Sequence, residues 1–177
     1  MPRLQHRGMA RLIFTILLWT ASHALAADAQ WIAAFGRAAE SQETDIVRLA
    51  YRHPLAERDA WWMPTHAQFG GSLWRVPDIR GSTRRLDLNA TAIWRNQRPW
   101  GYLEAGFGGY LLSKTINNQD TRMPSAFEFG SHLGLGFALT KTQSVGIALQ
   151  HLSNAGIKQP NGGIDLLLVQ YTIALRD

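Results

Sequence analysis

Three segments of this chain alternate apolar residues with polar residues or glycine at a period of two. In 127–139, phenylalanine and leucine occupy most odd positions, while glutamate, histidine and glycine occupy most even ones. Segments 86–95 and 101–111 repeat the pattern. An amphipathic helix repeats its apolar residues about every 3.6 positions, whereas a strand turns successive side chains to opposite faces. The alternation therefore predicts an all-β protein whose strands have one apolar face.

The number and spacing of these segments predict how the strands are arranged. We expect strands at 30–37, 44–53, 61–76, 84–95, 100–113, 125–139, 144–153 and 164–175. Short connections at 96–99 and 140–143 alternate with longer ones, as periplasmic turns alternate with external loops in outer-membrane barrels. The predicted fold is an eight-stranded antiparallel transmembrane β-barrel of the outer membrane.

A soluble barrel of the lipocalin type would turn the apolar face inward, and alternation alone fits both arrangements. The composition of the second face favours the membrane barrel. A small closed barrel can pair polar side chains internally and accommodates glycine where little room remains. The second face carries glycines together with Asp87, Glu104, Glu128, His132 and Gln150.

The N-terminus has the features of an export signal. Arg3, Arg7 and Arg11 flank the apolar run LIFTILLWTA, and Ala24-Leu25-Ala26 supplies a cleavage pattern of small residues. The run is shorter than the roughly 20 residues of a spanning helix. We therefore predict a cleaved signal peptide at 1–26 and one barrel domain at 27–177.

Composition excludes several classes of partner. The chain has 18 basic and 13 acidic residues, and three of the basic ones lie in the predicted signal peptide, so the mature net charge is +2. No basic stripe indicates a nucleic-acid partner. The chain has no cysteine, and no two histidines have metal-ligand spacing, so we expect neither a metal nor another cofactor. A monomer and a homo-oligomer both stay open.

The segment LQHLSNAGIKQPNGGID, at 149–165, contains the candidate catalytic residues. His151 and Ser153 are in phase with the apolar residues of their strand, and Asp165 is in phase with those of the next strand. With both termini in the periplasm, all three face lipid at the outer end of the barrel. A serine nucleophile needs an adjacent base, and residues two apart on a strand lie about 7 Å apart. A carboxylate can hold the second ring nitrogen of the histidine.

The loop that follows could complete such a site. It offers backbone N–H groups and the side-chain amides of Asn154 and Asn161 as donors to an oxyanion. A His-x-Ser triplet alone is weak support, because a polar pair at a strand end commonly just meets water or headgroups.

The segment HLSNAGIKQPNGGID closely resembles the lipid A 3-O-deacylase (PagL) family, whose signature is His-x-Ser-Asn-Ala-Gly followed by a Lys-Gln-Pro-Asn loop. YLEAGFG at 102–108, AFEFGSHLGLGFAL at 126–139 and QSVGIALQH at 143–151 look like strands of the same family. The resemblance implies an outer-membrane barrel that hydrolyses the ester-linked acyl chain at the 3-position of lipid A.

The resemblance also implies roles for individual residues. Ser153 is expected to be the nucleophile and His151 the general base, while Asn154, Gly156 and Asn161 shape the oxyanion site. The acid of the family is usually glutamate, and this chain has Asp165 there, shorter by one methylene.

Basic residues in the longer loops are candidates for binding the phosphates of lipid A. Arginine forms strong charge-assisted hydrogen bonds to phosphate, although solvated loop charges are an equal alternative. The principal candidates are Arg84, Arg85 and Lys158, and further ones are Arg80, Lys114 and Arg122. Two other functions also fit the sequence: a non-enzymatic structural or adhesive barrel, and a phospholipid esterase.

Overall fold

The computed structural model describes residues 29–39, 43–55, 62–78, 81–117 and 122–175. The predicted signal peptide at 1–26 lies outside these residues, as does Arg80. Within the described ranges, no helix is long and apolar enough to cross a membrane.

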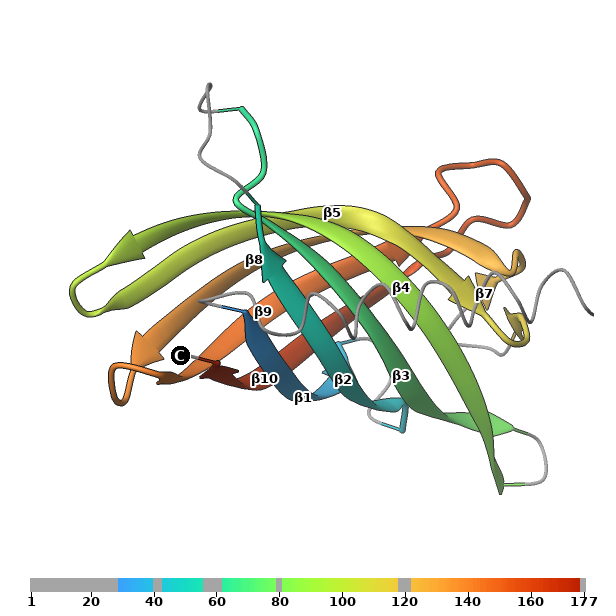
Figure 1. Cartoon of the computed structure of the whole chain (residues 1–177). Helices are drawn as coiled ribbons and strands as arrows, with labels where there is room; N and C mark the ends of the chain where they lie inside the picture. Colours follow the sequence, from blue (N-terminus) through green and yellow to red (C-terminus); the bar gives the residue numbers. More distant parts are fainter. Residues whose placement is uncertain (1–28, 40–42, 56–61, 79–80, 118–121, 176–177) are drawn as a thin grey trace, which may run out of the picture.

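Eight of the described strands form one closed barrel in which every neighbouring pair is antiparallel (Figure 1). They are β1 (Gln30–Ala38), β2 (Asp45–Pro54), β3 (His66–Asp78), β4 (Gly81–Arg98), β5 (Gly101–Leu112), β8 (Phe127–Ala138), β9 (Gln143–Ser153) and β10 (Ile164–Ala174). Their order around the barrel is β1-β10-β9-β8-β5-β4-β3-β2. Two short strands between β5 and β8, β6 (Ile116–Asn117) and β7 (Arg122–Met123), pair separately. The predicted fold class is confirmed.

Strand boundaries depart from the predicted ones mainly around β3. This strand begins at His66 instead of at 61, because Pro64 lacks the backbone N–H that a ladder needs. At the other end, β3 and β4 pair as far as Asp78 and Gly81, so most of the predicted loop PDIRGST is strand.

The outward face of the barrel is apolar and exposed. Leu88, Leu133 and Leu149 are 64%, 70% and 65% exposed, and they lie on three different strands. Apolar exposure on this scale is stable only against lipid. At the end where β1 begins and β10 ends, here called the periplasmic end, outward aromatic rings pair: Trp31 with Tyr51 at 5.5 Å and Trp100 with Phe137 at 5.8 Å. Such rings are typical of a membrane interface.

The interior has two halves of different character. In the periplasmic half, the Glu104 carboxylate accepts hydrogen bonds from Arg52 at 2.9 Å and from Arg95 at 2.7 Å, and it lies 3.5 Å from His132. The other half, toward the outer end, contains an apolar cluster in which Trp74 and Leu152 pack with Ile116 and Met123 of the β6–β7 hairpin. The polar residues expected inside are buried there too: Asp87 accepts hydrogen bonds from Trp74 at 2.6 Å and from Asn89 at 2.7 Å. The sequence did not predict the apolar cluster beside them.

Glycine occupies inward positions that face large rings, as the sequence predicted. A Cβ atom built at Gly130 on β8 would overlap the ring of Tyr110 on β5. A Cβ atom at Gly136 would overlap Tyr102 in the same way. The two strands therefore enclose buried tyrosine rings only because these positions carry no side chain.

Candidate active site

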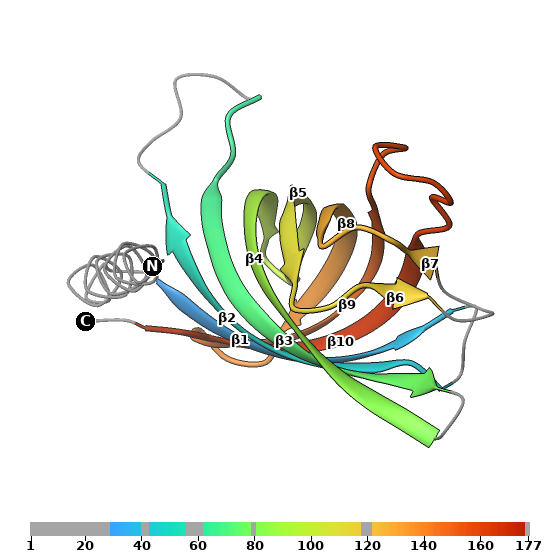
Figure 2. The ribbon, with the colours of Figure 1, turned by 90° about the vertical axis from the view of Figure 1, so that its right-hand side faces the viewer.

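The candidate catalytic residues lie at the outer end of two adjacent strands. His151 and Ser153 end β9, and Asp165 is the second residue of β10. The loop between the strands, 154–163, extends beyond the barrel (Figure 2). The side chains share the outward face with Ile147 and Leu149, which are 51% and 65% exposed. The structure thus places all three side chains on the outward face of the barrel.

His151 and Asp165 are direct cross-strand partners. The Nδ1 atom of His151 lies 2.6 Å from Oδ1 of Asp165, and the two side chains are 49% and 54% exposed. The aspartate therefore reaches the ring without an intervening water, although it is shorter than glutamate. With Nδ1 bound to the carboxylate, Nε2 is the ring nitrogen left to exchange a proton with a reacting group.

Ser153 lies on the wall of a small cavity beside this pair. The cavity has a volume of about 260 Å³ and is lined by Phe107, Phe129, Ser131, His151 and Ser153, among others. Its aromatic part is formed by Phe107 and Phe129, whose rings stack with centroids 6.1 Å apart. Among the described hydrogen bonds, none joins His151 to Ser153. Hydrogen bonds of this kind often tighten only when substrate binds.

The loop after Ser153 is held by the Asn154 side chain, which is fully buried. Its Nδ2 donates to the Lys158 carbonyl at 3.0 Å, and its Oδ1 accepts from the Gly156 N–H at 3.0 Å. The Asn154 N–H in turn donates to Oδ1 of Asn161 at 3.1 Å. The Asn154 amide thus braces the loop.

The structure separates the basic candidates. Lys158 lies in the β9–β10 loop and is exposed. Arg84 and Arg85 lie on β4, three strands around the barrel from β9. Arg84 is exposed on the outward face, whereas Arg85 is half-buried opposite the buried Trp74. Lys114 is exposed just after β5, and the side chain of Arg122 lies outside the description.

Sequence reasoning missed the residues that complete the cavity. Ser131 on β8 is the cross-strand neighbour of His151, and Phe129 is the neighbour of Ser153. Both are in phase with outward residues of β8, so alternation placed them on the correct face. Only the pairing of β8 with β9 shows that they border the site.

Comparisons with known proteins agree with the fold and the site segment. Residues 45–174 match the family model "Lipid A 3-O-deacylase (PagL)". Lipid A deacylase PagL of Bordetella bronchiseptica is 39% identical over 108 residues, which span 59% of each chain and so less than two thirds of that relative. Its counterpart in Pseudomonas aeruginosa is 38% identical over 126 residues, 66% of this chain and 71% of that protein.

A solved structure of the outer membrane enzyme PagL has the same architecture. It superposes with a TM-score of 0.64 at 25% identity, covering 82% of this chain and 99% of that one. The family match covers all the barrel strands after β1, including β9 and β10. The chain therefore belongs to the lipid A 3-O-deacylase (PagL) family.

Proposed function

We propose that this chain is an outer-membrane serine esterase that removes the ester-linked 3-O acyl chain from lipid A of lipopolysaccharide. The observation that carries the proposal is the 2.6 Å contact between His151 and Asp165 on the lipid-facing side of the barrel. A barrel with a purely structural role has no need of a histidine–carboxylate pair next to a serine beside lipid. Family membership supports lipid A as the substrate. Export by the predicted signal peptide at 1–26 is part of the same proposal.

The proposed reaction has two steps. Ser153 Oγ attacks the ester carbonyl carbon while His151 Nε2 takes its proton, and Asp165 stabilises the imidazolium that forms. The tetrahedral intermediate expels the sugar 3-oxygen, which receives that proton, and leaves the acyl chain on Ser153. Water, deprotonated by His151, then attacks the acyl-enzyme, and the fatty acid leaves as His151 returns the proton to Ser153 Oγ.

The negative oxygen of each tetrahedral intermediate needs a donor near Ser153. Ala155 lines the cavity beside Ser153, and its backbone has a left-handed φ of 53°. Its N–H makes no hydrogen bond within the described residues, and we assign the oxyanion contact to it. Asn154, Gly156 and Asn161 then act by holding the loop that presents this N–H.

The surroundings of the site suit the two parts of the substrate. The rings of Phe107 and Phe129 offer an apolar wall to the acyl chain next to the scissile ester. Lys158 is the one principal basic candidate on the loop beside Ser153, and we assign it a phosphate of the substrate.

Mass spectrometry of lipid A from Gram-negative cells that express the protein tests the proposal. The native chain should remove one 3-hydroxyacyl chain, whereas Ser153→Ala and His151→Asn should not. Ser144→Ala, at the periplasmic end of the same strand, is the matched control and should retain activity. Unmodified lipid A, both in cells with folded protein and in a detergent assay, would contradict the proposal. Release of fatty acid from phospholipid instead would identify a phospholipid esterase.

A further inference from the structure

Strands β1 to β4 form the wall of the barrel opposite Ser153. On each of them the outward face changes from apolar to charged between two successive outward residues. Successive outward residues on a strand are about 7 Å apart, so this change marks a sharp boundary between hydrocarbon and headgroups. The apolar and charged positions are Phe35 and Arg37 on β1, Val47 and Asp45 on β2, Leu73 and Arg75 on β3, and Leu86 and Arg84 on β4.

The charged positions form one continuous row. Arg37 is the cross-strand partner of Asp45, Asp45 of Arg75, and Arg75 of Arg84. We call these four residues the charged row. Since adjacent strands are about 4.8 Å apart, the row spans about 14 Å of the headgroup region. Arg37 donates to Asp45 at 2.7 Å, while Arg75 and Arg84 have no ion-pair partner among the described residues.

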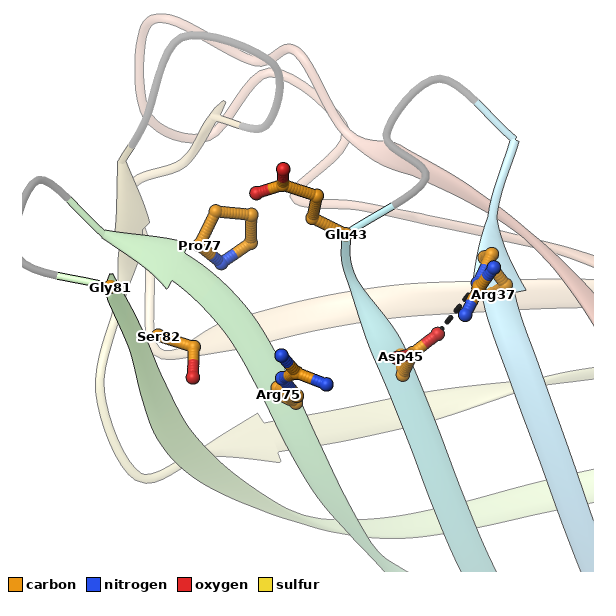
Figure 3. A pocket seen from close by; sticks show the side chains of 7 residues that line it. All are labelled: Arg37, Glu43, Asp45, Arg75, Pro77, Gly81 and Ser82. Atoms are coloured by element: carbon orange, nitrogen blue, oxygen red, sulfur yellow. Dashed lines mark hydrogen bonds and ion pairs between the residues drawn. The ribbon is translucent and has the colours of Figure 1, made fainter.

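A polar cavity of about 400 Å³ opens along three residues of this row, Arg37, Asp45 and Arg75. Figure 3 shows Ser82 and Arg75 on one side of the cavity and the Arg37–Asp45 pair on the other. Glu43 lies above them in this view. The cavity thus presents a guanidinium without an ion-pair partner together with two carboxylates. Guanidinium groups bind phosphate in two-pronged fashion, and carboxylates accept hydrogen bonds from sugar hydroxyls.

An apolar groove of about 730 Å³ lies directly below the row. Ala33 and Gly71 lie between leucines that include Leu49, Leu73 and Leu88. The small residues hollow the lipid-facing surface where neighbouring positions carry large side chains. Because the groove begins at the apolar residues next to the charged row, one amphiphile can occupy both.

We propose that the charged row and the groove together bind a second lipid A molecule, which is not the substrate. One phosphate lies against Arg75 and Arg84 and the other near Arg37, its sugar hydroxyls face Asp45 and Glu43, and its acyl chains fill the groove over Gly71. β3 is four strands from β9 in either direction around the barrel, so this lipid cannot reach Ser153. The site requires only the outer-membrane barrel and is independent of the hydrolase.

Lipid A is the occupant that fits both the position and the charges. The row lies at the same end of the barrel as the β9–β10 loop, where the headgroups are those of the outer leaflet. A row of about 14 Å with arginines at both ends matches a phosphorylated sugar headgroup better than the single phosphate of a phosphoglycerolipid.

Native mass spectrometry of the purified Ser153→Ala protein tests the site, because substrate stays intact in this variant. The protein is titrated with bis-phosphorylated lipid A, dephosphorylated lipid A or phosphatidylglycerol. Up to two bis-phosphorylated lipid A molecules should bind per barrel. Arg75→Gln should weaken one of the two sites about tenfold. Gly71→Leu should remove that site by filling the groove, and its Cβ meets neighbours only at 3.4 Å or more.

Two matched controls make similar substitutions outside the proposed lipid site. Arg98→Gln removes an exposed arginine at the opposite end of β4, and Ala90→Leu also places a leucine on the outward face, outside the groove. Both should retain two lipid A molecules. Equal binding by Arg75→Gln and Arg98→Gln would overturn the proposal. Phosphatidylglycerol bound as tightly as lipid A and in an Arg75-dependent way would overturn the assignment to lipid A.

The binding test can succeed or fail independently of the proposed deacylase function. With Ser153 restored, Arg75→Gln and Gly71→Leu should still deacylate lipid A. If the native chain deacylates no lipid A but shows Arg75-dependent binding, the proposed function fails while the second lipid site stands.

Discussion

The contact between His151 and Asp165 shows how a shorter acid can occupy a position that is usually glutamate in this family. The two residues are direct cross-strand partners, and such pairs have Cβ atoms about 4.5–5.5 Å apart. At that separation an aspartate reaches the imidazole directly, as the 2.6 Å distance shows. A glutamate at the same place has one methylene more than the span requires and must fold its side chain.

This geometry predicts the effect of substitutions at Asp165. Asp165→Asn should lower kcat/KM by about two to four orders of magnitude, because the amide cannot stabilise the imidazolium. Asp165→Glu should stay within about tenfold of the native value, since the carboxylate is kept. Hydrolysis of purified lipid A measures both. Equal rates for all three forms would remove Asp165 from the mechanism.

At the scale of elements, the β9–β10 loop is held chiefly by the Asn154 side chain. The buried Asn154 side chain bonds to the backbone of Gly156 and of Lys158, and it bridges the turn that places Ala155 beside Ser153. The strands that carry the site do not depend on these bonds, because their ladders are formed independently. Loop geometry and barrel stability should therefore respond to different substitutions.

Asn154→Ala should lower kcat/KM by about tenfold or more, because the loop loses the bonds that orient its N–H groups. The unfolding midpoint of the barrel in urea should change little. Asn96→Ala, an exposed asparagine at the periplasmic end of β4, controls for the loss of the amide. A large drop in stability with no loss of activity would contradict this assignment.

The inward glycines predict that a glycine-to-alanine substitution costs more stability at an inward position than at an outward one. Gly130→Ala should destabilise the barrel by about 1–3 kcal/mol, because its Cβ overlaps the buried Tyr110 ring. Gly71→Ala should cost much less, since its Cβ would meet neighbours at 3.4 Å and 3.6 Å. Urea unfolding of the two variants in the same detergent measures the difference, and equal losses would contradict it.

At the scale of the whole molecule, two interior layers stabilise the barrel by different means. The periplasmic half contains a charge network around Glu104, and the outer half contains an apolar cluster that includes residues of the β6–β7 hairpin. A buried charge network is costly to break, since removing one partner leaves the others desolvated and unpaired. The apolar cluster lies directly behind β9 and β10 and so supports the strands that carry His151 and Asp165.

Glu104→Gln should therefore lower the free energy of unfolding by about 3–5 kcal/mol, because Arg52 and Arg95 remain buried without a counter-charge. Glu43→Gln makes the same change at an exposed rim position and should alter stability by less than about 0.5 kcal/mol. Urea unfolding in detergent measures both. A small loss for Glu104→Gln would show that water reaches the network.

The sequence by itself determined the strand count and the face on which each strand residue lies, because alternation is a local property with a period of two. For that reason His151, Ser153 and Asp165 could be assigned to the lipid-facing side before any pairing was known. The apolar cluster of the outer half is also visible in the sequence, since residues 166–169 are apolar at every position. Alternation alone, however, does not distinguish the two halves of the interior.

Only the tertiary structure decided which residues of different strands are neighbours. The placement of Asp165 opposite His151, of Ser131 beside the site, and of Arg75 between Asp45 and Arg84 depends on strand register. Register is set by closure of the whole barrel, through contacts between residues far apart in the chain, and a shift of two residues would leave every side chain on its face while changing all its partners.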